Sequence, residues 1–191
     1  MKRIILAVLT VALWSCVSHA ETFSIDPYHS SVLFSVKHVV GKVTGRFDKF
    51  SGTYEYDPNK LGDLSAQATI DVSSVNTGIE KRDNHLRSPD FFDVQKYPTM
   101  TFKSTQISDV NGNRAKLHGD LTLHGVTKPV VLDLEMAGIV KDPMGKGNRS
   151  GGSATGRLNR NDFGVGPATG PMSGMLGKDI DITIEIEGVS K

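Results

Sequence analysis

The segment Ile180-Asp181-Ile182-Thr183-Ile184-Glu185-Ile186-Glu187, near the C-terminus, alternates isoleucine with a polar residue along its whole length. Successive side chains of a β-strand point to opposite faces, so this pattern predicts a strand with one buried and one solvent-exposed face. Such two-faced strands are typical of antiparallel sheets, because the strands of a parallel sheet are usually covered by helices on both faces.

The same alternation recurs along the chain, and turn signals such as Asp57-Pro58-Asn59 separate the runs. About eight antiparallel strands in one small domain indicate an all-β sandwich or a closed barrel. Gly45, Gly52 and Gly119 fall on the inward face, which favours a coiled barrel wall or a ligand that needs room. We therefore predict an eight-stranded antiparallel barrel, with strands near 22–39, 43–57, 64–73, 99–107, 114–123, 128–140, 151–161 and 179–188.

A barrel of this size is wide enough for one slim ligand. Strands of this length give a cavity on the order of 30 Å long, since a strand rises about 3.3 Å per residue. Such a cavity suits a long chain better than a compact sugar.

One short helix is expected within residues 77–92, where the sequence becomes charged. Thr77 and Glu80 fit a capping box at its start. Leu86, Phe91 and Phe92 are expected to face the barrel and close over its cavity. The charged neighbours could bind one another or an anionic head group; we interpret them as holding the segment in place: Arg82, Asp83, His85 and Arg87.

Residues 1–20 have a basic start, an apolar run and the small-x-small pattern Ser18-His19-Ala20. These features predict a secretory signal peptide cleaved after Ala20, and therefore export to the periplasm. Cleavage before a lipidated Cys16 is the alternative. We expect residues 21–191 to form one domain without an integral membrane segment.

The predicted mature chain carries 20 basic and 21 acidic residues, so no basic excess indicates nucleic-acid binding. Cys16 is the only cysteine, which excludes a thiol nucleophile or a cysteine-based metal site in the mature chain. His118 and His124 share a polar strand face and are too far apart in sequence for one metal. We predict no metal and no cofactor.

Several motifs resemble the YceI-like family. The resemblance implies an extended, lipocalin-like barrel whose apolar cavity takes polyprenyl lipids, quinone tails or other long amphiphiles. It also implies a periplasmic location and no established catalytic activity. The motifs that carry it are Asp26-Pro27-x-His29-Ser30, Gly45-Arg46-Phe47, Arg82-Asp83-x-His85-Leu86-Arg87-Ser88, Gly119-Asp120-Leu121-Thr122-Leu123 and Asn159-Arg160-x-Asp162-Phe163-Gly164.

We therefore predict a non-enzymatic protein that binds, transports or sequesters a long isoprenoid-type lipid in the periplasm. His38, at the end of an apolar strand face, is either a core residue or the point where a polar head group meets the barrel mouth. The expected ligand-binding residues are Val32, Phe34, Val36, His38, Phe47, Ile70, Leu86, Phe91, Phe92, Phe102, Leu121 and Leu132.

Two other classes of function stay open. The first is a hydrolase or isomerase of a lipid-like substrate, with His38 or His85 beside a carboxylate as general acid–base. The second is a protein-interaction module, for example a homodimer that buries Phe91 and Phe92.

Overall fold

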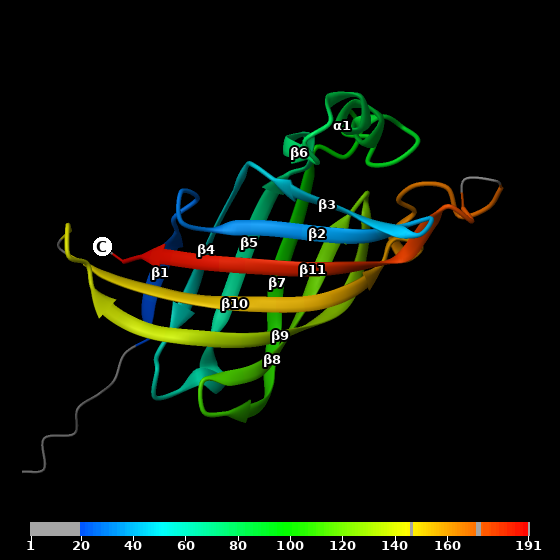
Figure 1. The fold of residues 1–191 in the computed structure, drawn as a ribbon. Helices are drawn as coiled ribbons and strands as arrows, with labels where there is room; N and C mark the ends of the chain where they lie inside the picture. The colour runs from blue at the N-terminus through cyan, green and yellow to red at the C-terminus, as the bar shows by residue number, and fades with distance from the viewer. Residues whose placement is uncertain (1–19, 146, 171–172, 191) are drawn as a thin grey trace, which may run out of the picture.

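The computed structural model describes residues 20–145, 147–170 and 173–190, so the predicted signal peptide with Cys16 lies outside the described residues. The described chain is a β-barrel with one α-helix, α1 (Glu80–Arg87), lying across one end (Figure 1). The strands are β1 (Glu21–Ile25), β2 (Ser31–His38), β3 (Gly41–Phe47), β4 (Phe50–Tyr56), β5 (Ser65–Asp71), β6 (Val75–Asn76), β7 (Thr99–Asn111), β8 (Arg114–Leu123), β9 (Val126–Lys141), β10 (Asn148–Asn159) and β11 (Leu176–Val189). The short 3₁₀ segments are η1 (Leu61–Asp63), η2 (Val72–Ser74) and η3 (Arg160–Phe163).

Eight strands form the closed ring, in the order β1-β4-β5-β7-β8-β9-β10-β11, and β1 pairs with β11 to complete it. The remaining strands extend this wall: β2 pairs with β11 beyond β1, β3 pairs with β2, and β6 pairs with β3. All of these pairings are antiparallel. The predicted eight-stranded antiparallel barrel with one helix is therefore confirmed.

The structure divides two of the predicted strands and shortens a third. The predicted strand 22–39 is split into β1 and β2 by a corner at residues 26–30, and 43–57 is split into β3 and β4. The strand predicted at 64–73 ends at Asp71, whose carboxylate accepts a hydrogen bond from the Ser73 amide at 2.9 Å and begins η2. After the first division β1 pairs with β4 while β2 pairs with β3, and after the second β3 pairs with β2 while β4 pairs with β1 and β5.

The corner between β1 and β2 is held by side chains. Pro27 has no amide hydrogen to donate, and the Tyr28 amide donates to Asp26 Oδ1 at 3.0 Å. In this corner the Ser30 hydroxyl replaces the backbone groups of a neighbouring strand as a hydrogen-bond partner of β11. It donates to the Glu187 carbonyl at 3.1 Å and accepts from the Glu187 amide at 2.9 Å. The wall of the barrel stays hydrogen-bonded through the corner.

The core has two parts. One cluster surrounds Phe23, which is fully buried and stacks on Tyr54 with ring centroids 5.3 Å apart. The other lies near α1 and contains the buried residues Phe47, Phe91 and Phe163. Within the described ranges, no helix has the length and apolar character needed to cross a bilayer.

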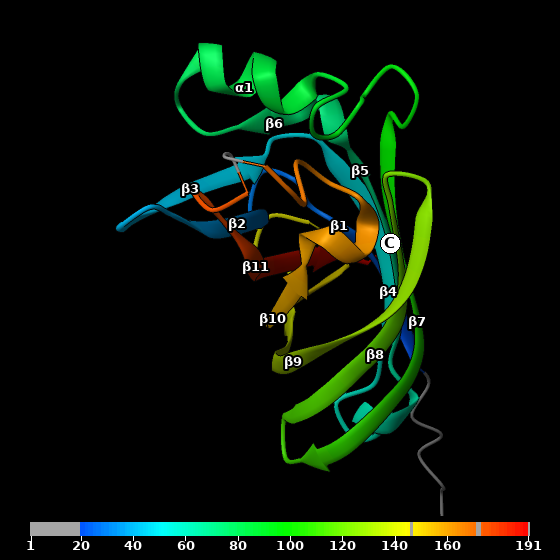
Figure 2. The same ribbon diagram turned by 90° about the vertical axis from the view of Figure 1, so that its right-hand side faces the viewer.

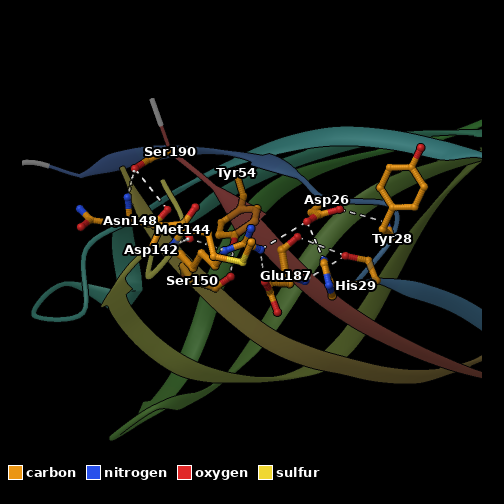
Figure 3. A network of polar contacts seen from close by, with 12 residues as sticks. Asp26, Tyr28, His29, Tyr54, Asp142, Met144, Asn148, Ser150, Glu187 and Ser190 are labelled. Atoms are coloured by element: carbon orange, nitrogen blue, oxygen red, sulfur yellow. Dashed lines mark hydrogen bonds and ion pairs between the residues drawn. The ribbon is translucent and has the colours of Figure 1, made fainter. Parts of the chain in front are cut away.

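A network of charged side chains lies near the C-terminal end of β11, beside β10 and the corner after β1 (Figure 3). The Arg149 guanidinium binds Asp26 at 3.3 Å, Asp142 at 3.2 Å and the Glu187 carboxylate. A hydrogen bond with His29 lowers the pKa of Asp26, and the Met144 amide lowers the pKa of Asp142. Through Arg149 on β10, the ionised carboxylates join the corner after β1, the loop after β9 and β11.

This network predicts that the protein loses stability in acid. A carboxyl group whose pKa is lowered by folding stabilises the native state above its unfolded pKa, near 4, and this contribution disappears as the pH falls through the folded pKa. Arg149→Met should lower the unfolding temperature at pH 7, and the difference from wild type should shrink below about pH 4. Thermal unfolding followed by circular dichroism from pH 7 to pH 3 measures this. A difference that is constant across that pH range would contradict an electrostatic origin.

Candidate functional site

The interior of the barrel contains two adjoining cavities, of about 170 and 260 Å³. The inner cavity reaches toward Tyr54, and the outer cavity lies beneath α1. Four side chains line both cavities, so the two cavities lie next to each other along the barrel and only side chains separate them. The shared residues are Val32, Met100, Leu158 and Ile182.

All twelve residues predicted to bind the ligand line this interior. Their contact with a ligand stays a prediction. The inner cavity is lined by Val32, Ile70, Phe102, Leu121 and Leu132. The outer cavity is lined by Val32, Phe34, Val36, His38, Phe47, Leu86, Phe91 and Phe92.

The inward glycines make room for aromatic rings of the barrel. A Cβ at Gly119 would overlap the Phe102 ring, and a Cβ at Gly45 would overlap the Phe34 ring. The sequence left open whether these glycines serve strand coiling or a ligand. At these two positions the space is filled by neighbouring phenylalanines, so the free volume comes from elsewhere in the wall.

Aromatic side chains form the roof of the outer cavity. Phe92 meets Phe47 edge-on, with centroids 5.9 Å apart, and Phe47 lies 5.6 Å from Phe34 on β2. Phe91 is buried, and the His85 ring meets it edge-on at 5.0 Å. The segment after α1 therefore packs onto the barrel through these phenylalanines, in agreement with its predicted position over the cavity.

The start of α1 differs from the predicted capping box. The N-cap is Ile79, which provides no side-chain cap, and Gly78 has a φ of +77°. This turn brings Thr77 beside Asp83, which is 6% exposed. The Thr77 amide and hydroxyl both donate to Asp83 Oδ1, at 2.8 and 2.5 Å. Asp83, and not Glu80, is thus the acidic partner of Thr77.

Arg82 and Arg87 attach α1 to the barrel mainly through hydrogen bonds to backbone carbonyls. Arg82 Nη2 donates to the Thr77 carbonyl at 2.8 Å, and Arg82 Nε donates to the Thr77 hydroxyl at 2.6 Å. Arg87 donates to the carbonyls of Ser73 and Val75 at 2.7 and 2.8 Å. These contacts agree with the interpretation that the charged residues of the helix hold the segment in place.

Arg160, on η3, is the most important residue of the site that sequence reasoning missed. It is 5% exposed, and burial lowers the pKa of its guanidinium. Four hydrogen bonds join it to backbone carbonyls on both sides of the loop that follows. The acceptors are Val165 at 2.8 Å, Gly177 at 2.9 Å, Pro167 at 3.0 Å and Leu176 at 3.4 Å.

The segment around Arg160 fills a gap in the barrel wall. β9 and β10 are paired only as far as Asp133 and Thr155, and beyond that point η3 contacts β9 and β11. His124 Nδ1 lies 3.2 Å from the Phe163 carbonyl, and its ring meets Tyr97 at 4.5 Å. The expectation that His124 belongs to a solvent-exposed polar face is therefore wrong, because it sits in the turn after β8 and contacts the wall segment.

The polar groups of the outer cavity are all neutral or basic. The lining residues whose side chains can carry a positive charge are His38, Arg82, His85 and Arg160. No acidic residue is among the described side chains that line this cavity. The lining can therefore donate hydrogen bonds to an acceptor oxygen at one end of an otherwise apolar ligand.

Asp26, His29 and Glu187 have the side-chain types of a metal site, and their candidate ligand atoms lie within 4.8 Å of one another. Arg149 already binds both carboxylates of this group. The guanidinium supplies the positive charge there, so we interpret the cluster as an ion-pair network that supports the fold.

Comparison with known proteins gives consistent results. The family model described as YceI-like domain matches residues 23–188. A UPF0312 protein of Vibrio cholerae is 39% identical over 196 aligned residues that cover all of both chains. The crystal structure of a Campylobacter jejuni YceI protein superposes with a TM-score of 0.71 at 35% identity, over 81% of this chain and 90% of that one. A polyisoprenoid binding domain from Saccharophagus degradans shares the fold, with a TM-score of 0.66 at 18% identity over 88% of this chain and 98% of that one.

Proposed function

The chain belongs to the YceI-like family, and on that basis we propose that it binds a long isoprenoid-type lipid, or a similar amphiphile, inside its barrel. The observation that carries the proposal is the apolar interior, in which two adjoining cavities of about 170 and 260 Å³ share four wall residues. The description of the Saccharophagus degradans domain as polyisoprenoid binding supports the same class of ligand.

The shape and chemistry of the interior suit a chain with a small polar end. The inner cavity is lined by side chains such as Leu117, Leu132 and Ile184, and it would take the far end of the tail. Burial of apolar surface, at about 25 cal/mol per Å², provides affinity without specific polar contacts. The head group would lie in the outer cavity, where Arg82 lies on the lining and offers a donor to a carbonyl, hydroxyl or phosphate oxygen.

Binding without catalysis fits the arrangement of the histidines. His85 Nε2 lies 3.1 Å from Asp90 Oδ2, but Asp90 does not line the outer cavity, and its side chain is 74% exposed while that of His85 is about half exposed. His38 lies at the rim of the outer cavity and is exposed. With the predicted signal peptide, these features support a carrier or sequestering protein that works in the periplasm.

Mass spectrometry of the protein, purified from its own host without delipidation, tests the proposal. We expect a bound species that extraction into organic solvent identifies as a long-chain lipid. Delipidated protein should then take up a long-tailed quinone, measured by the quenching of a dye at the mouth. Failure to recover a lipid, together with failure to take up the quinone, would exclude the proposed function.

A further inference from the structure

The tip of the hairpin between β2 and β3 is apolar and exposed. His38 pairs with Gly41, so the turn consists of Val39 and Val40 alone. Val40 is 98% exposed and Val39 is 49% exposed. Figure 2 shows this hairpin projecting from the barrel, with the loop before β11 beside it. Isolated exposed valines are common on protein surfaces, so this pair is informative only together with the backbone and the charges around it.

The valines are unfavourable for the turn that they form. Val39 has a φ of +51°, in a region that β-branched residues rarely occupy. Two-residue hairpin loops strongly favour glycine, asparagine or aspartate at such positions. Strain of this kind is retained mainly where it serves a function. The side chains of the tip therefore matter for something other than the stability of the hairpin.

Basic side chains surround the tip. Lys37 and Lys42 lie beside it on the hairpin, and Lys178 lies on the neighbouring start of β11. Lys42 binds Asp181 at 3.0 Å, whereas Lys37 and Lys178 line a surface hollow that has no acidic residue among its described side chains. Asp179 and Asp181 lie on the same part of β11 and Lys42 is paired with Asp181, so Lys37 and Lys178 are the lysines of the tip that line the hollow.

The tip lies at the opening of the outer cavity. The Val39 amide donates to the Met175 carbonyl at 2.8 Å, and both Met175 and His38 line that cavity. Met175 is also exposed, so apolar side chains continue from the tip to the rim. A surface that accepts the tip would therefore lie next to the opening of the barrel interior.

We propose that the β2–β3 hairpin docks the mouth of the barrel on an anionic lipid bilayer. Val39 and Val40 enter the interface between head groups and acyl chains, and the lysines contact anionic head groups. Each lysine near an anionic surface adds affinity for the bilayer, and the burial of each valine in the apolar region adds further affinity. Docking in this orientation lets a lipid pass between the bilayer and the cavity without crossing open water.

Vesicle flotation tests the docking surface. The mature protein should float with vesicles of phosphatidylglycerol and phosphatidylcholine, and much less with phosphatidylcholine alone. Val39→Gly with Val40→Asn gives the turn a favourable sequence, so the variant should be at least as stable as wild type and should bind about tenfold more weakly or worse. Val110→Asn is the matched control, because Val110 is an exposed valine near the tip of the β7–β8 hairpin and should not affect binding.

A fluorescent reporter identifies the inserted residue. Trp14, the only tryptophan of the sequence, lies in the predicted signal peptide. Val40→Trp should therefore give emission from the tip alone, shifted to shorter wavelength by anionic vesicles, while Val110→Trp should not respond. An equal emission shift in both variants, or no shift in either variant, would overturn the proposal. So would a shift that appears without vesicles as protein concentration rises, because the tip would then bind a second copy. The vesicles contain no isoprenoid, so the result is independent of the proposed cargo.

Discussion

Replacing Arg160 by methionine should destabilise the protein by about 3 kcal/mol. The guanidinium is buried and donates to four backbone carbonyls, on both sides of the loop between η3 and β11. Methionine fills a similar volume but leaves these carbonyls without their donor. For a chain of this length the unfolding temperature should fall by about 10 °C. Because Val165 and Leu176 line the outer cavity, a bound lipid should also dissociate faster.

Two further variants test this explanation. Arg160→Lys keeps the positive charge but lacks the planar fork of donors, so it should recover only a minor part of the lost stability. Arg157→Met is the matched control: Arg157 is 68% exposed and pairs with Asp181 at 2.7 Å, so its loss should cost less than about 1 kcal/mol. Equal stabilities of Arg160→Met and Arg157→Met, both in urea and on heating, would show that the Arg160 guanidinium does not stabilise the loop through these carbonyls.

The strands could be predicted from the sequence because their signal is local. The alternation of Ile180 to Glu187 depends only on which side chains meet water, and β11 follows it. The corners depend on partners far along the chain. Ser30 completes the hydrogen bonding of Glu187, 157 residues away, and no local pattern in the sequence reveals this pair. The strand near 22–39 was therefore predicted as continuous.

The lining of the cavity was predicted better than the contacts that hold it. Apolar residues on an inward face must line the interior of any barrel, so the placement of Phe102 or Leu121 follows from the period of the strand. Arg160 bonds to carbonyls, which every residue carries, so the sequence gives no sign of its partners. Thr77 was paired with Glu80 by spacing alone, whereas the positive φ of Gly78 directs it to Asp83.

Leu158 offers a direct test of whether one ligand occupies both cavities. It lies on β10 opposite Ile180 of β11, and it lines the inner and the outer cavity. An indole at this position would narrow the connection between the cavities. A long isoprenoid tail would then have to leave the inner cavity, whereas a short tail that fits in the outer cavity would not be affected.

Leu158→Trp should therefore weaken the binding of a long-tailed quinone by about 100-fold and leave a short-tailed quinone within about twofold. Excluding as few as three or four CH₂ groups from an apolar site costs about 2.7 kcal/mol, which corresponds to that factor. Titration with both quinones, followed by the emission of the new tryptophan, measures the difference. Val131→Trp serves as the control, because Val131 is 48% exposed on β9 and does not line either cavity. An equal loss for both tail lengths would show that the indole disturbs the mouth, and unchanged binding of the long tail would show that the ligand does not extend past Leu158.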